Sequence, residues 1–111
     1  MVVIVPKLLK LIAGKGVIAM AIYPFILVRD AEESGNETML NHERIHFRQQ
    51  IELGLLFFYL LYGAYYLHNR RRGYSHSNAY RNIPFEKEAY ANESNSDYLV
   101  TRKLWTWVKF R

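Results

Sequence analysis

A helical pattern over residues 37–68, which no proline interrupts, constrains this fold more than any other feature. A straight helix of that length would extend about 48 Å, which is long for one small domain. Gly54 and Gly63 lie within the pattern, and each disfavours a helix by about 1 kcal/mol relative to Ala. We therefore predict a long helix with a break, near Gly63. Ser34 and Glu37 have the spacing of a capping box at its start.

The first turns of this segment carry the sequence HERIH at residues 42–46, which matches the pattern H-E-x-x-H. Residues four apart lie one turn apart on the same face of a helix, so His42 and His46 can bind one Zn²⁺. Glu43 is offset around the helix, where it can reach a metal-bound water as a general base without being a ligand. The alternative is two surface histidines beside a helical ion pair.

The third metal ligand must come from elsewhere in the chain. The sequence has no cysteine, so any metal is bound through His, Asp, Glu or water. No third histidine follows at metzincin spacing, because the position ten residues beyond His42 is Glu52. The best candidate is FEKEAY at residues 85–90, which places Glu86 and Glu88 on a second helix.

The pairing of HERIH with a downstream FEKEAY resembles the gluzincin clan of zinc peptidases, and within it very small bacterial proteins of about this length. Residues 40–50 and 80–93 carry the resemblance. It implies a zincin-like fold, hydrolysis of a peptide or protein substrate, and Zn²⁺ held by His42, His46 and Glu86. Glu43 would then be the catalytic base.

Glu88 remains the alternative third ligand. Several gluzincin families have an aspartate where Tyr90 stands here, and that aspartate orients a zinc-binding histidine. We therefore expect Glu93 or Asn92 to supply this contact. The candidate donors to the oxyanion of the transition state are Tyr80, Tyr90, His76 and Arg81.

The remaining segments predict an α+β fold in one domain, residues 1–111. Pro6 and Gly14 are typical of the two ends of a helix, here over residues 7–13. β-Branched and aromatic residues predict strands over residues 17–20 and 25–29.

Beyond the long helix we expect a basic, polar loop and then two helices, over residues 69–82, 85–92 and 97–109. The architecture expected is a small N-terminal strand region packed on the long metal helix, followed by these two helices. In zincins an edge strand ahead of the metal helix pairs with an extended substrate. Residues 25–29 are the candidate for that strand, and a plain core strand is the alternative.

An uncharged, apolar stretch over residues 53–67 covers all sides of a helix. It is shorter than the roughly 18 to 20 residues that span a bilayer. It is either a core helix or a surface that contacts a membrane or a second copy of the chain. Tyr65 and Tyr66, followed by the arginines at 70–72, are typical of a membrane interface.

The net charge of +5 also suits nucleic acid. No nucleic-acid-binding motif accompanies the basic cluster, which argues against that partner. Residues 1–5 lack the basic region and cleavage site of a signal peptide, so we expect a cytoplasmic protein, or one at the inner face of the membrane.

The leading functional hypothesis is therefore zinc-dependent peptide hydrolysis. The alternative is a non-catalytic scaffold or membrane-surface adaptor that zinc stabilises. The small size of the chain suggests one further hypothesis, in which a C-terminal segment with Trp105 and Trp107 lies across the site and holds it latent.

Overall fold

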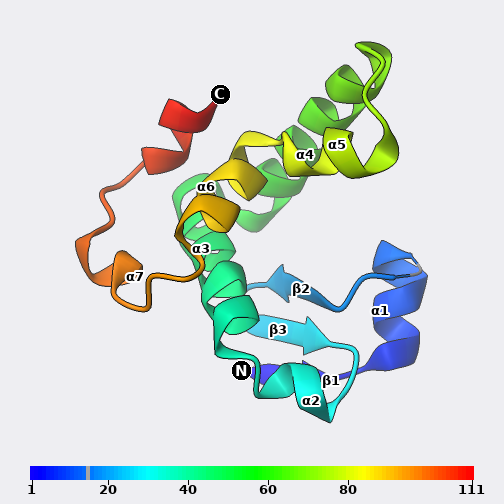
Figure 1. The fold of residues 1–111 in the computed structure, drawn as a ribbon, viewed down its shortest axis with the longest axis vertical. Helices are drawn as coiled ribbons and strands as arrows, with labels where there is room; N and C mark the ends of the chain where they lie inside the picture. The colour runs from blue at the N-terminus through cyan, green and yellow to red at the C-terminus, as the bar shows by residue number, and fades with distance from the viewer. Residues whose placement is uncertain (15) are drawn as a thin grey trace.

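Three short strands near the N-terminus form one mixed sheet that packs against a long helix (Figure 1). The computed structural model describes residues 1–14 and 16–111. The strands are β1 (Val2–Ile4), β2 (Ala19–Ile22) and β3 (Phe25–Val28), in the order β1-β3-β2. β3 runs parallel to β1 and antiparallel to β2. The helix α1 (Pro6–Ala13) follows β1, as its Pro and Gly signals predict.

The central position of β3 corrects one expectation. Both of its edges are paired, so residues 25–29 form a core strand and cannot add a substrate strand. The strand expected over residues 17–20 lies two residues later, and β1 was not predicted. β2 pairs with β3 along one edge only. Its other edge has no neighbouring strand among the described residues.

The long helical pattern forms two helices, α3 (Glu37–Leu53) and α4 (Leu55–Arg71), which meet at an angle of 110°. The break is at Gly54, not near Gly63 as expected. Gly54 has φ 81° and ψ 145°, a backbone conformation that residues other than glycine rarely adopt. The cap of α3 is Asn36, whose side chain accepts a hydrogen bond from the Met39 amide, and not Ser34.

Two short helices were not expected, one of them within the loop expected over residues 69–82, and a break divides one expected helix. The short helices are α2 (Ala31–Ser34) and α5 (His76–Arg81). The expected helix over residues 85–92 is α6 (Pro84–Asn92). The last expected helix, 97–109, is instead α7 (Tyr98–Thr101) and a 3₁₀ helix, η1 (Thr106–Phe110). The chain leaves α7 at Arg102, whose guanidinium group is buried against two carboxylates.

The apolar core lies on both sides of α3. One cluster joins the sheet to the start of α3 through Ile26, Val28, Met39 and Leu40. The second joins α4, α6 and η1 through Phe58, Ile83, Phe85 and Trp107. The predicted α+β class, with strands packed on the histidine-bearing helix, is confirmed.

None of the helices among the described residues is long and apolar enough to cross a membrane by itself. Of these helices, only α3 and α4 taken together reach that length and hydropathy, and they are sharply bent.

Candidate metal centre

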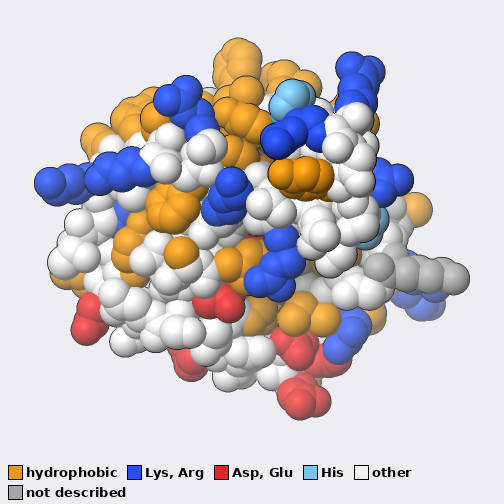
Figure 2. Space-filling model, turned by 45° about the horizontal axis from the view of Figure 1, so that its top comes forward, with side chains coloured by type: hydrophobic (Ala, Val, Ile, Leu, Met, Phe, Trp, Pro, Cys, Tyr) orange, Lys and Arg blue, Asp and Glu red, His pale blue; other side chains and the backbone are white. Residues whose placement is uncertain are grey.

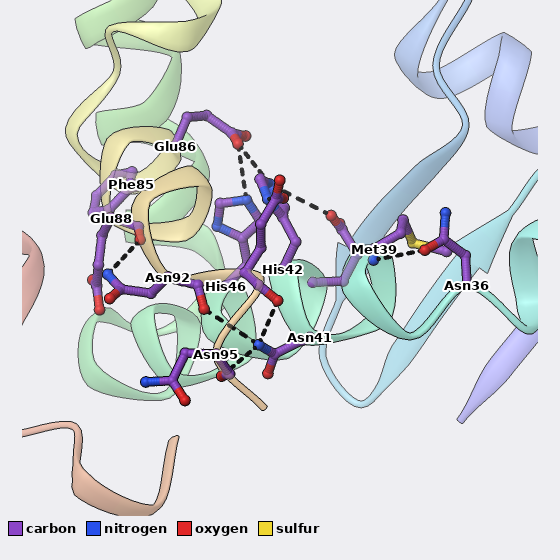
Figure 3. Close-up of polar contacts among 12 residues, drawn as sticks. Asn36, Met39, Asn41, His42, His46, Phe85, Glu86, Glu88, Asn92 and Asn95 are labelled. Carbon is purple, nitrogen blue, oxygen red and sulfur yellow. Dashed lines mark hydrogen bonds and ion pairs between the residues drawn. The ribbon is translucent and has the colours of Figure 1, made fainter. Parts of the chain in front are cut away.

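The two motifs meet where α6 packs across α3, and their side chains form a buried cluster (Figure 3). One ligand atom from each of His42, His46 and Glu86 lies within 4.8 Å of the other two. The Glu86 Oε1 atom is 2.9 Å from His42 Nε2 and 3.2 Å from His46 Nε2. All three side chains are buried. The structure therefore brings together the three residues that the sequence nominated as metal ligands.

Gln49 determines which nitrogen of His46 carries the proton. The Gln49 amide nitrogen donates hydrogen bonds to the Phe85 carbonyl and to Glu88 Oε1, at 3.1 and 3.0 Å. The Gln49 oxygen must then accept from His46 Nδ1, which lies 2.7 Å away. The neutral His46 ring consequently has its lone pair on Nε2, the atom that faces Glu86.

His42 lies between two carboxylates. Its Nδ1 is 2.7 Å from Glu93 Oε2 and its Nε2 is 2.9 Å from Glu86 Oε1, so a ring that bound a metal through Nε2 would donate through Nδ1 to Glu93. Asn41 positions Glu93, because the Asn41 amide donates to the Glu93 and Asn95 carbonyls at 2.8 and 3.0 Å. Glu93 thus makes the contact expected of Glu93 or Asn92.

Tyr90, which stands where the gluzincin families that the motifs resemble have aspartate, packs its ring against His42 instead. The two ring centroids are 4.5 Å apart. The Asn92 amide donates to the Glu88 carbonyl and does not reach a histidine ring.

The donor set fits a metal cation. Two imidazole lone pairs and one carboxylate oxygen converge, and three such acceptors repel one another unless a cation or a proton lies between them. Within the described residues, His46 Nε2 is buried and has no hydrogen-bond partner. Ligands of a tetrahedral zinc site lie about 3.3 Å apart, close to the contacts seen here.

Electrostatics at the cluster also favour positive charge. Burial lowers the pKa of His46, but the facing Glu86 carboxylate outweighs it and raises the pKa to about 9. For the Glu86 carboxyl group, burial acts in the opposite direction and raises the pKa. The two histidines outweigh burial and hold this pKa well below its usual range. The Tyr62 hydroxyl donates to Glu86 Oε2 at 2.6 Å, which leaves Oε1 to face the rings.

Glu88 has a different role from Glu86. It points away from the histidines (Figure 3) and accepts hydrogen bonds from Arg102, Tyr98 and Gln49. The Arg102 guanidinium also binds Glu52, at 2.7 and 3.1 Å. Both carboxylates are buried in these contacts, so Glu88 is not available to the cluster.

Glu43 lies beside the cluster without joining it. Its Oε2 atom is 3.9 Å from His42 Nε2, and burial raises the pKa of its carboxyl group. Two cavities, of about 640 and 320 Å³, flank Glu43 and share it as a wall. The walls of the larger include the polar side chains of Asn36 and Glu93, whereas the smaller is lined by aromatic rings of α4 and reaches His46.

The candidate donors to the oxyanion differ in their surroundings in the structure. Tyr80 lines both cavities, and burial raises its pKa, so it is a neutral phenol. His76 lines both as well, but it contacts the Tyr66 hydroxyl at 2.8 Å. The Arg81 guanidinium stacks over the Tyr90 ring at 4.1 Å. Tyr80 is the candidate best placed beside Glu43.

The C-terminal segment does not lie across the cluster. Trp107 packs on Phe85, with centroids 4.8 Å apart, and neither Trp105 nor Trp107 lines either cavity. The expectation that this segment blocks the site is therefore wrong. Through Arg102 the segment instead supports the far side of α6.

Sequence reasoning missed Gln49, Tyr62 and Arg102. Gln49 stands three residues after His46 on one helix face, a spacing that does indicate side-chain contact. Tyr62 and Arg102 are separated from Glu86 and Glu88 by 24 and 14 residues, and no local pattern links them.

The fold and site define an α+β protein with a buried His-His-Glu cluster that can bind a metal ion. No family model matches the sequence, and no curated protein or solved structure matches it either. The functional argument therefore rests on the site itself.

Proposed function

We propose that this chain is a zinc-dependent peptidase in which His42, His46 and Glu86 hold the ion and Glu43 is the general base. The observation that carries the proposal is the orientation of the two histidine rings. Glu93 and Gln49 each contact an Nδ1 atom, so both Nε2 atoms face one carboxylate oxygen and are the atoms left to bind an ion there. A bound zinc ion supplies a Lewis acid that activates water and polarises a substrate carbonyl.

Glu43 contributes the proton chemistry. It lies on the same helix as both histidines and forms a wall of both cavities. A carboxylate so placed takes a proton from the attacking water and returns it to the leaving amine. The phenol of Tyr80, which lines the same two cavities, supports the negative oxygen of the transition state.

The outer edge of β2 favours an extended peptide as the substrate. The Ile18 carbonyl accepts from the Arg29 amide on the β3 side, so the next residue, Ala19, directs its backbone groups outward. Farther along the same edge, the Ala21 carbonyl accepts from the side chains of Gln50 and Tyr59. Ala19 lines both cavities. A peptide that pairs with this edge would pass Glu43 with side chains in each cavity.

The Glu43→Gln substitution tests this proposal. We expect hydrolysis of a mixed peptide library to fall by at least about 100-fold while bound zinc stays at one per chain, since Gln keeps the shape and loses the base. Metal content by mass spectrometry and cleavage by chromatography are the two measurements. Full activity in the Glu43→Gln variant would remove Glu43 from the mechanism.

A zinc-stabilised, non-catalytic scaffold is the second candidate. It is favoured by the position of the cluster, which ties α3 to α6 at the centre of the chain. In that case zinc would raise stability in both the wild type and Glu43→Gln, and neither protein would cleave any peptide.

A further inference from the structure

The outward face of α4 carries an apolar stripe that the described part of the fold leaves exposed. Its large members are Leu56, Phe57, Leu60 and Leu67, which are 69%, 63%, 58% and 57% exposed. Ala64 is also exposed and completes the helical spacing. The stripe extends about 17 Å along the helix. Solvent-exposed helix faces rarely carry this many large apolar side chains in one row, so the stripe indicates a contact surface.

Positive charge continues the stripe at the C-terminal end of α4. Arg70, Arg71 and Arg72 are all exposed there. The exposed acids lie elsewhere: Glu32 on α2 and Glu37 at the start of α3 lie beside the sheet, and Asp97 precedes α7. Figure 2 shows the same separation on one face, with hydrophobic and basic side chains over its upper part and acidic ones along its lower edge.

We propose that the α4 stripe and its arginines dock this protein on an anionic membrane surface. An interfacial helix buries its apolar side chains at the boundary of headgroups and acyl chains, and its basic residues contact anionic headgroups. The stripe, Arg70 and Arg71 lie on one helix, so the apolar and the basic side chains can reach the same membrane surface. No insertion of a spanning helix is involved.

A second copy of the chain fits the surface less well. Antiparallel packing of two α4 helices would place the arginines of one copy at the start of α4 in the other. The acid nearest that position is Glu52, which is buried in its ion pair with Arg102. Parallel packing would bring arginines against arginines. Neither arrangement supplies the opposite charge that an anionic lipid surface provides.

Docking through α4 would place the candidate metal centre close to the membrane. The opposite face of α4 supplies Phe58, Tyr59 and Tyr62 to the smaller cavity. One helix diameter, about 10 Å, therefore separates the headgroups from that cavity. This inference concerns location and does not depend on catalysis.

The experiment is cosedimentation of the full chain with vesicles of phosphatidylcholine alone or of phosphatidylcholine and phosphatidylglycerol in equal parts. We expect binding to the anionic vesicles only. The double variant Arg70→Gln and Arg71→Gln should bind about 25-fold more weakly, at about fivefold per arginine. Arg44→Gln with Arg48→Gln removes the same charge from exposed positions on α3 and should bind like the wild type.

The apolar part of the surface needs its own variant. Leu60→Glu should weaken vesicle binding by at least about tenfold. Val100→Glu, at an exposed apolar position on α7, should leave it unchanged. Both positions are on the surface, so circular dichroism should show both variants folded.

Three results would overturn the proposal. The first is no binding to anionic vesicles, and the second is equal loss in the stripe variants and their controls. The third is a stable dimer in sedimentation equilibrium that Leu60→Glu dissociates, which would assign the surface to a second copy.

Discussion

Hydrogen bonds to the far side of each imidazole ring decide what the histidines of this cluster can do. A histidine on an H-E-x-x-H helix is a metal ligand only if its free lone pair faces the metal position. Here Nδ1 of each ring lies 2.7 Å from an acceptor, Glu93 for His42 and Gln49 for His46, which leaves Nε2 of both rings for the metal position. The chain therefore controls its candidate site through residues that would touch no metal.

The Gln49→Leu substitution tests this control. Without an acceptor at Nδ1, His46 is free to rotate and to change tautomer, so zinc affinity should fall about 10- to 100-fold. Competition with a chromogenic chelator measures the affinity. Gln50→Leu is the matched control, because Gln50 is also buried on α3 but binds the Ala21 carbonyl and the Tyr23 amide. An equal loss of affinity in both variants would mean that general damage to α3, and not the tautomer, is responsible.

At the scale of elements, the turn at Gly54 and the anchor at Arg102 hold the site together. The turn directs α4 away from α3 by 110°, so α4 can supply Tyr62 to Glu86 and aromatic walls to the smaller cavity. The anchor joins the C-terminal segment to Glu52 on α3 and to Glu88 on α6. These two contacts keep α6 against the histidine helix.

Substitution of the glycines at the start and in the interior of α4 should act in opposite directions. Gly54→Ala places a Cβ at positive φ and should destabilise the fold by about 1 to 3 kcal/mol. Gly63→Ala lies in a helix interior with open space around it, and should stabilise by about 1 kcal/mol. Urea unfolding followed by circular dichroism gives both values. Equal effects of the two substitutions would contradict the assignment of the turn to Gly54.

The Arg102→Met substitution should lower the free energy of unfolding by about 3 to 5 kcal/mol, because it leaves two buried carboxylates without their partner. Thermal unfolding of this variant beside Arg111→Met, which removes an exposed arginine from the same segment, measures the difference. Higher peptidase activity in Arg102→Met would instead restore the idea of a blocking C-terminal segment.

At the scale of the whole molecule, the cluster joins the two halves of a small core. α3 contributes two of its residues and α6 the third, and separate apolar clusters lie on either side. A metal bound there would cross-link elements that are about forty residues apart in the chain. Because small chains bury little surface on folding, such a cross-link supplies a large share of their folding free energy.

Zinc should therefore raise the melting temperature strongly. At free zinc about a thousandfold above its Kd, binding stabilises by about 4 kcal/mol. For a chain of this size that corresponds to roughly 15 °C. Differential scanning fluorimetry with zinc and with chelator measures the shift, and His46→Ala should abolish it. If zinc does not change the melting temperature of the wild type, the chain has no such metal site.

The sequence by itself determined the features that depend on near neighbours. Helical periodicity places His42 and His46 on one face whatever the rest of the chain does, and the strand and helix signals were enough for the α+β class. Local spacing also nominated both Glu86 and Glu88.

Only the tertiary structure decided between the two carboxylates, because that choice depends on which face of α6 packs on α3. Phe85 in the apolar cluster and Arg102 beyond α7 set the rotation of α6, and they turn Glu86 inward and Glu88 outward. The central position of β3 and the supporting role of the C-terminal segment likewise depend on partners distant in the chain. Such pairings leave no periodic signal in a single sequence, since burial and ion pairing select them only when the whole chain is packed.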